Sequence, residues 1–221
     1  MCITPSGDNI NFLALYRIGG RQQGGFMQTT NKGRVATRQL ALLALLTALV
    51  ALLAYLGGFV KIGGMASISL TLIPVVLGAA LCGPVAGAWL GGVAGVIFFM
   101  TADSAFWMGL SVGGTIITVM VKGIASGLCA GLVYKALEKV NRYVAVLVAA
   151  VVCPVVNTGI FLLGCLVFFM DAVNAGALAE GMSVGGYMIV FFVGLNFVFE
   201  LLSNILLSPT IVRLINIRKK N

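Results

Sequence analysis

The sequence predicts an all-α integral membrane protein, a bundle of six transmembrane helices with both termini in the cytoplasm. Of its 221 residues, 60% are hydrophobic and 9% are charged, and the mean hydropathy is +1.10, whereas soluble domains carry about 25% charged residues. Residues 62–121 contain a single charge, Asp103, and uncharged apolar runs of about 18 residues or more indicate membrane spans. Lysines and arginines gather at the ends of these runs, as they do beside membrane helices.

The first 37 residues differ from the rest, being polar and rich in glycine with no apolar run long enough for a secretory signal. We expect this N-terminal segment to be disordered and cytoplasmic. All glycine codons begin with GG, so Gly24 and Gly25 could encode a purine-rich ribosome-binding sequence just before Met27. Two interpretations remain open: Met27 is the true start, or the whole segment is an ordinary flexible tail.

A transmembrane domain of residues 38–212 follows, ending in a basic cytoplasmic tail of residues 213–221. A bilayer core of about 30 Å needs roughly 20 helical residues, fewer where a segment is buried or re-entrant. Proline cannot continue a helix but suits the first turn of the next, so Gly83 and Pro84 separate the second span from the third. If these two short spans form one broken segment, the total falls to five. The expected spans are residues 39–57, 67–82, 85–100, 110–134, 143–170 and 187–207.

The connections between the spans carry the charge that sets their orientation. Short loops rich in lysine and arginine stay in the cytoplasm, and cations flank both the first and the last span, which requires an even number of spans. With six spans, twelve of the fourteen lysines and arginines lie on the cytoplasmic side, including those of the two terminal segments. The two exceptions are Lys61 in an outward connection and Lys122 within a span. The outward connections are a glycine-rich connector at residues 57–64, a loop at residues 101–109 with Asp103 and Trp107, and a loop after residue 170.

Small residues at helical spacing predict close helix contacts, because membrane helices associate through close packing and hydrogen bonds. In the third span, glycine recurs every fourth residue, which places it on one helix face. We interpret this stripe mainly as internal packing. The first span contains Ala44 and Ala48, a weaker signal of the same kind. The stripe consists of Gly83, Gly87, Gly91 and Gly95.

Polar side chains inside the spans suggest a binding site, since such groups are expensive in hydrocarbon. The fourth span carries Lys122 with Thr118, the fifth Asn157 and the sixth Asn196. Counting about 1.5 Å per residue from the outer span ends, the lysine and both asparagines lie about 14–20 Å deep. One shared polar layer near mid-membrane is therefore predicted.

Glu200 lies one turn below Asn196, and an intramembrane acid usually pairs with a cation. Lys122 is the only candidate within a span. Three interpretations remain open. Lys122 and Glu200 form a structural ion pair, Lys122 holds an anionic group of a substrate, or the two groups take part in proton coupling.

Several kinds of chemistry find no support in the sequence. It contains no histidine, which removes the commonest general base and metal ligand. The five cysteines include no C-x-x-C pair, so we expect structural filler and no metal site. No G-x-x-x-x-G-K-[ST] nucleotide motif occurs. An intramembrane enzyme would need clustered acids with a metal, or a nucleophile with a base, and neither pattern is found.

The segment of residues 68–88, ISLTLIPVVLGAALCGPVAGA, resembles the second-to-third helix region of S components, the substrate-binding subunits of energy-coupling factor (ECF) transporters. The likeness covers most of residues 36–213. In that family, small residues in an A-x-x-x-A pattern on the first helix dock against a scaffold transmembrane subunit, which works with two cytoplasmic ATPases. The resemblance therefore gives Ala44 and Ala48 this docking role, leaves ATP to the partner subunits with no cofactor in this chain, and implies a multi-pass protein of a bacterial cell membrane.

The family captures water-soluble vitamins from outside with its first loop and the outer parts of helices four to six. The chain looks most like the riboflavin and pantothenate group. An anionic vitamin such as pantothenate would use Lys122 or Lys61, whereas the ring of riboflavin would stack on Phe59, Trp107 or Tyr187. The glycines at residues 57–64 would suit a lid that closes over the ligand. An autonomous secondary carrier or channel for a small solute is the alternative, although no internal repeat of the kind found in such carriers is seen.

Overall fold

A computed structural model of the chain describes residues 37–57 and 70–220, which are almost entirely helical. All of the predicted N-terminal segment except Thr37 lies outside the described residues, and so does most of the predicted lid. The chain divides into two units between Leu42 and Leu43. The arrangement below concerns the second unit, Leu43–Asn221. Of the first unit, only the start of the helix Thr37–Gly57 is described.

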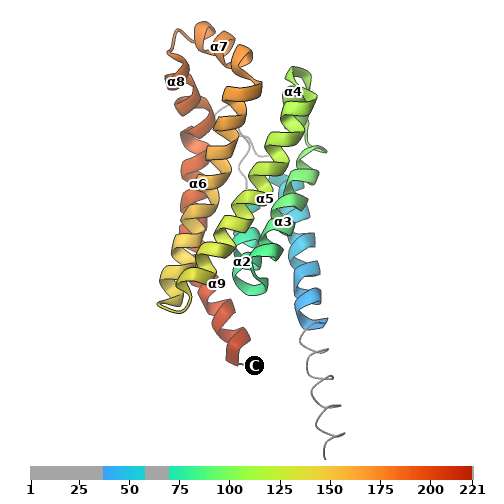
Figure 1. Cartoon of the computed structure of the whole chain (residues 1–221), viewed down its shortest axis with the longest axis vertical. Helices are drawn as coiled ribbons and strands as arrows, with labels where there is room; N and C mark the ends of the chain where they lie inside the picture. Colours follow the sequence, from blue (N-terminus) through green and yellow to red (C-terminus); the bar gives the residue numbers. More distant parts are fainter. Residues whose placement is uncertain (1–36, 58–69, 221) are drawn as a thin grey trace, which may run out of the picture. The chain divides into compact units, whose positions relative to one another are not determined.

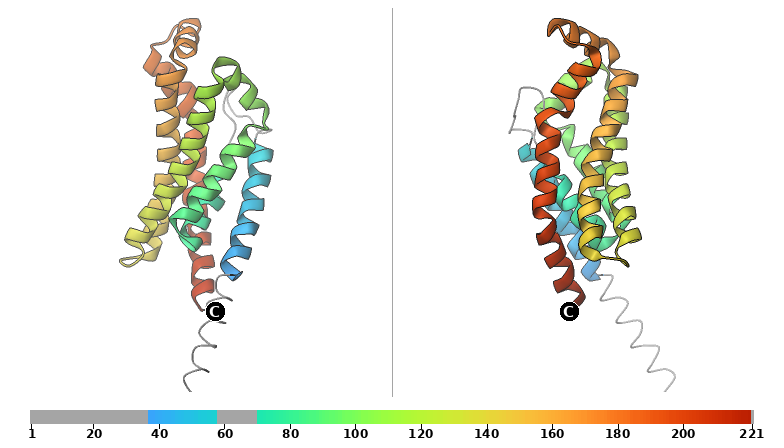
Figure 2. Two further views of the ribbon diagram at one scale, coloured as in Figure 1. Left: turned by 45° about the vertical axis from the view of Figure 1, so that its right-hand side comes forward. Right: turned by 90° about the vertical axis from the view of Figure 1, so that its left-hand side faces the viewer.

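From α2 onward the elements follow one another with short connections. In chain order they are Thr37–Gly57, α2 (Leu72–Cys82), α3 (Pro84–Phe98), α4 (Ala102–Leu110), α5 (Val112–Leu137), α6 (Arg142–Phe168), α7 (Met170–Ala179), α8 (Val184–Tyr187), the π-helical segment η1 (Met188–Val193) and α9 (Gly194–Lys220). Helices α5 and α6 lie side by side along most of their length, and α9 packs along α6 (Figure 1, Figure 2). Helices α4 and α7 lie at one end of this unit, and the α5–α6 turn lies at the other.

Four of the described helices are long and apolar enough to cross a membrane: Thr37–Gly57, α5, α6 and the stretch Phe197–Ile217 of α9. Helices α3 and α4 are together long and apolar enough for a fifth span, but they meet at an angle of 84°. They count as a span only if the pair is one broken segment. Helix α2 is apolar but only 11 residues long. The multi-pass membrane character of the chain is therefore clear, while the count of six spans stays a prediction.

Polar caps fix where α5 and α6 begin. The Ser111 hydroxyl accepts a hydrogen bond from the Gly114 amide at 3.2 Å, and the side-chain carbonyl of Asn141 accepts one from the Tyr143 amide at 2.9 Å. Such caps satisfy amides that the first helical turn leaves without partners. The two spans predicted here, residues 110–134 and 143–170, match α5 and α6 to within a few residues.

The break between α2 and α3 occurs at the predicted Gly83 and Pro84. Gly83 has φ +98°, a conformation that costs residues with a Cβ considerably more than glycine. Pro84 then occupies the first turn of α3, where its missing amide proton costs no hydrogen bond.

Two connections expected to be loops are helical. The predicted loop of residues 101–109 is largely the helix α4, so Asp103 lies in a first helical turn and Trp107 near the end of a helix. The segment after residue 170 forms α7, with Asp171 in its first turn. Helices this short do not contain the run of about 18 apolar residues that identifies a membrane span in a sequence.

The sixth span also differs from its prediction. It begins with the short helix α8 and the π-helical segment η1 instead of a continuous α-helix at Tyr187, and α9 continues to Lys220 instead of ending near residue 207. The predicted basic tail, residues 213–221, is therefore mostly the last part of α9.

Helices α3 and α5 approach at the glycine stripe. A Cβ added to Gly87 would fall on the carbonyl oxygen of Gly127, and one added to Gly91 on that of Gly123. Gly95 lies next to Met120, whose sulfur would be 3.2 Å from an added Cβ. Gly87 and Gly91 thus face α5 at backbone contact distance, as small residues of membrane helices commonly do, whereas a Cβ added to Gly83 would meet nothing within 4 Å.

Candidate functional site

One face of α5 carries the polar side chains singled out in the sequence. Thr115, Thr118 and Lys122 are three and four residues apart and so share one side of the helix. Both threonines are buried. The Thr115 hydroxyl lies 2.8 Å from the backbone carbonyl oxygens of both Trp107 and Ser111. It shares its proton between them and so ties the end of α4 to the first turn of α5.

The amine of Lys122 lies between aromatic rings. Its Nζ atom is 4.8 Å from the ring centroid of Phe161 on α6 and 5.5 Å from that of Phe98 on α3. A cation within about 6 Å of a ring centroid is attracted by the ring quadrupole. Glu200 of α9, only 2% exposed, also attracts Lys122 electrostatically. Groups from three neighbouring helices thus surround this amine.

Trp107 extends these rings toward the α4 end of the bundle. Its indole meets Phe161 edge to face at 5.3 Å and 86°, and Phe169 at 5.2 Å and 67°. Aromatic rings in such T-shaped contacts stabilise one another beyond their buried area. A continuous path of ring contacts therefore leads from the end of α4 to Lys122 in the middle of α5.

The predicted stacking residue Tyr187 belongs to the apolar cluster next to this path. Its ring lies 4.6 Å from that of Phe191, at 31°, and it is 6% exposed. A Cβ on Gly176 would lie 2.5 Å from the Tyr187 hydroxyl oxygen, so α7 closes over the ring. The buried members of this cluster are Cys165, Phe169, Val173, Ala177, Tyr187 and Met188.

Two polar groups of the predicted site lack hydrogen-bond partners among the described residues. The hydroxyl of Thr118 is buried and makes no hydrogen bond there. The Asn157 amide, half-buried on α6 one turn before Phe161, makes none with a described residue either. Buried polar groups are almost always paired, so the Thr118 hydroxyl calls for an explanation, such as a ligand or an ordered water.

The acidic side of the site is on α9. The Asn204 side-chain amide donates to the backbone carbonyl of Glu200 at 2.8 Å, and Asn204 is 1% exposed. Its own side-chain oxygen is buried without a hydrogen-bond partner in the described part of the chain. Asn204 thus adds a polar atom without a hydrogen-bond partner one turn from Glu200 on α9.

The structure brings only some of the predicted site residues together. Lys122 and Glu200 interact, Trp107 joins them through Phe161, and Thr118 shares the Lys122 face of α5. Lys61 lies outside the described residues. The Asn196 side chain is also outside them, although its backbone belongs to α9. The binding roles of these two residues therefore stay predictions.

The two alanines predicted to dock a partner lie elsewhere. Ala44 and Ala48 are exposed on the helix Thr37–Gly57, while Leu46 and Val50 of the same helix are buried. The Trp89 indole of α3 donates to the Thr47 hydroxyl at 3.3 Å, which joins this helix to α3 beside the alanines. The alanine pair is thus open to contact.

Three aromatic residues of the site were missed in the sequence: Phe98, Phe161 and Phe169. Phe161 follows Asn157 by four residues and so shares its helix face, which was a usable signal. Phe98 and Phe169 carry no such signal, because they are two of thirteen phenylalanines in an apolar chain. Only the packing of α3 and α6 around Lys122 distinguishes them.

Comparison with known proteins supplies one match. The family model described as ECF transporter, substrate-specific component, matches residues 38–215. No curated protein and no solved structure matches the chain. The matched range includes every described helix of the site and almost all of the helix that carries Ala44 and Ala48.

Proposed function

Because the chain belongs to the family of substrate-specific components of ECF transporters, we propose that it captures a water-soluble vitamin of the pantothenate or riboflavin type outside the cell. The vitamin leaves on the inside after a reorientation driven by partner ATPases. The chain is thus a transporter subunit of a bacterial cell membrane, with no chemistry of its own.

The position of Lys122 carries this proposal. A single amine in the middle of α5, beside the rings of Phe161 and Phe98, is expensive to keep in hydrocarbon and is a functional candidate for that reason. Thr118 and Asn157 add a hydroxyl and an amide without hydrogen-bond partners among the described residues. Ring faces for the apolar part of a ligand and a few polar groups for its orientation are the usual make-up of a small-molecule site.

An anionic vitamin suits this arrangement better than a neutral one. A carboxylate would complement the Lys122 ammonium, and the rest of the ligand would lie along the rings that lead to Trp107. Riboflavin would instead need an open ring face for stacking, and Tyr187 already lies against Phe191. We therefore place pantothenate first and riboflavin second.

The proposed partners follow from the family. A scaffold transmembrane subunit would dock on Ala44 and Ala48, and two ATPase subunits would supply the energy. Residues 57–64, with Lys61, would close over the bound vitamin.

The first experiment identifies the ligand. The chain is purified alone, retained small molecules are identified by mass spectrometry, and pantothenate and riboflavin are then titrated calorimetrically. We expect tight binding of one vitamin without the ATPases. Lys122→Ala should weaken pantothenate binding by about tenfold or more, since a hydrogen bond to a charged group contributes about 1.5–3 kcal/mol.

Lys139→Ala is the matched control, because this lysine is exposed in the turn after α5. If Lys122→Ala binds every tested vitamin normally but unfolds at lower temperature, Lys122 is a structural partner of Glu200. If the chain binds neither vitamin, the proposed substrate group is wrong.

The alternative, an autonomous carrier, rests on the attraction between Lys122 and Glu200. Vesicles containing only this chain separate the two functions. A carrier would accumulate or exchange the solute without partners, whereas a capture subunit would bind it and not transport it.

A further inference from the structure

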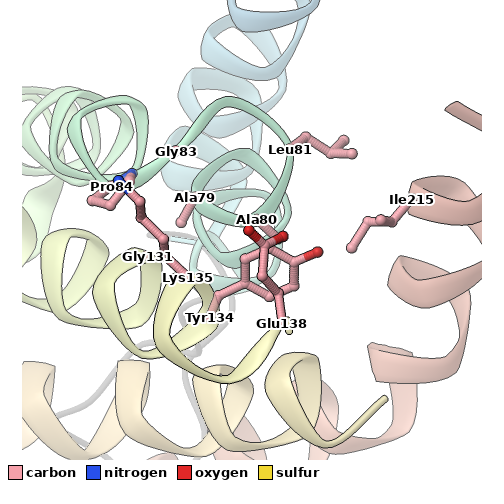
Figure 3. Close-up of a pocket in the computed structure, with 10 residues that line it drawn as sticks. All are labelled: Ala79, Ala80, Leu81, Gly83, Pro84, Gly131, Tyr134, Lys135, Glu138 and Ile215. Atoms are coloured by element: carbon pink, nitrogen blue, oxygen red, sulfur yellow. The ribbon is translucent and has the colours of Figure 1, made fainter. Parts of the chain in front are cut away.

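A cavity lies at the opposite end of the bundle from Trp107. Its volume is about 450 Å³, and it opens where α2, α3, α5 and α9 meet (Figure 3). The proposed vitamin site does not include any of its residues. The lining residues used below are Leu81, Gly83, Tyr134, Lys135, Glu138 and Ile215.

Two helix ends of opposite polarity face this cavity. Helix α2 ends at Cys82 and α3 begins at Pro84, and no side chain caps the α3 N-terminus at Gly83. The carbonyl end of a helix carries partial negative charge and the amide end partial positive charge. The wall formed by the α2–α3 break is therefore dipolar.

Tyr134 provides an independent observation. It lines the cavity yet is only 4% exposed, and its hydroxyl makes no hydrogen bond with a described residue. The hydroxyl oxygen is not one of the fully buried polar atoms, so it is open to the cavity that the side chain lines. Figure 3 shows its ring on the α5 wall of the cavity, next to Glu138. The cavity thus offers an unused donor from a side chain that packing holds in place.

The charged side chains add one positive and one negative group to the cavity, like the two helix ends. Lys135 and Glu138 both line the cavity and carry opposite charges. Ile215 of α9 and Leu81 of α2 add apolar walls. A ligand that fits such a lining has one anionic group, one cationic group that can donate hydrogen bonds, and an apolar part.

We propose that this cavity binds the headgroup of a phospholipid that carries a phosphate and a primary ammonium, of the phosphatidylethanolamine type. The phosphate is held by Lys135, the Tyr134 hydroxyl and the α3 N-terminus, a natural anion site. The ammonium donates to Glu138 and to the carbonyl end of α2. An acyl chain runs along Ile215.

The location agrees with this chemistry. The cavity adjoins the connection of residues 135–142, whose cations place it on the cytoplasmic side. Tyrosine and lysine at a membrane–water interface are at the level of lipid headgroups. Headgroup pockets between membrane helices are commonly found on this side.

The test compares two lipids that differ only in methylation. The full chain is placed in nanodiscs of phosphatidylethanolamine and phosphatidylcholine in equal parts, extracted in mild detergent, and its retained lipids are counted by native mass spectrometry. We expect phosphatidylethanolamine to be retained several-fold more, because trimethylammonium cannot donate to Glu138. Equal retention of both lipids would overturn the proposal.

Variants then locate the site. Tyr134→Phe and Lys135→Gln should each lower phosphatidylethanolamine retention by about tenfold. Lys135 is exposed, so its variant should fold even if the tyrosine variant does not. Lys139→Gln is the matched control, since Lys139 is exposed nearby and does not line the cavity. Equal losses in the Lys135 and Lys139 variants would mean a general charge effect and would reject the site.

Soluble competitors distinguish a lipid from a free anion. Phosphoethanolamine at millimolar concentration should reduce retention of the lipid, and inorganic phosphate at the same concentration should not. If inorganic phosphate competes equally well, the cavity binds a free phosphate and the lipid assignment is wrong.

Discussion

Thr118 and Gly164 show how tightly α5 and α6 pack beside the candidate site. A Cβ on Gly164 would fall on the Thr118 side chain, and Thr118 is buried. The absence of a side chain at residue 164 therefore creates the space in which the Thr118 hydroxyl lies. Substitutions at Thr118 and Gly164 therefore test the packing of α5 against α6 and leave Lys122 unchanged.

Gly164→Ala should destabilise the protein by about 1–3 kcal/mol, the usual cost of overpacking a well-packed interior. Adding Thr118→Ala removes the hydroxyl and methyl group in the way and should restore most of the loss. Thermal unfolding in detergent of both single variants and the double variant gives the coupling energy. Simple additivity of the two single effects would contradict the packing described here.

Residue type decides what the sequence can reveal at this scale. Lys122 stands out because charge inside a span is rare, and Trp107 because the chain has only two tryptophans. Of the rings beside Lys122, Phe98 resembles every other apolar residue of its helix, and Phe161 differs only in lying four residues after Asn157. The predicted candidates were therefore the unusual side chains, and their aromatic partners emerged only from tertiary structure.

At the scale of elements, α3 and α5 meet through backbone atoms along two pairs of glycines. Gly87 faces Gly127 and Gly91 faces Gly123, and a Cβ at any of the four would collide with a carbonyl oxygen of its partner. Contacts this close allow weak Cα–H···O hydrogen bonds between helices. The α3–α5 pair should therefore tolerate no side chain at these positions.

Gly91→Ala should lower the free energy of unfolding by about 2 kcal/mol or more, because rigid backbone atoms must separate. Gly92→Ala is the matched control. Its added Cβ would lie 3.4 Å from a side-chain atom of Ile124, an ordinary contact, and alanine favours a helix over glycine by about 0.5–1 kcal/mol. Unfolding of the two variants in a series of denaturing detergent concentrations measures both changes in stability. Equal effects at residues 91 and 92 would refute the backbone contact.

The long apolar helices were predictable and the short connecting helices were not, for one physical reason. Twenty apolar residues that must cross a bilayer leave a long signal, so the prediction for residues 39–57 is close to the helix Thr37–Gly57. Helices α4 and α7 contain nine and ten residues, too few for such a signal, and their acids Asp103 and Asp171 look like loop residues. The π-helical turn at η1 has no sequence signature that distinguishes it from α-helix.

On the scale of the whole molecule, the two ends of the second unit have different chemistry. Aromatic rings gather toward α4 and α7 and lead to Lys122 in the middle of α5, whereas the α2–α3 break and the end of α5 form a dipolar cavity. The cation distribution predicts that these ends face outside and inside, respectively. Vitamin capture and lipid binding are therefore proposed for opposite sides of the membrane, and each can be tested with the other left intact.

The proposed docking of the scaffold subunit uses a third surface, on the helix Thr37–Gly57. Ala44 and Ala48 are exposed one turn apart on the helix Thr37–Gly57, and small residues at this spacing allow another helix to approach closely. Replacing both by Trp would hold a partner helix several ångströms away. The buried Leu46 and Val50 on the same helix would be unaffected, so the variant should fold.

We therefore expect Ala44→Trp with Ala48→Trp to abolish co-purification of the scaffold subunit and vitamin uptake in cells, while the purified chain binds its vitamin as before. Leu132→Trp, at a residue of α5 that is 52% exposed, controls for the effect of a bulky group on the lipid-facing surface. Pull-down from co-expressing cells and calorimetry on the isolated chain supply the two measurements. Normal co-purification would place docking on another face, and loss of vitamin binding would mean that the alanines support the fold of the capture site.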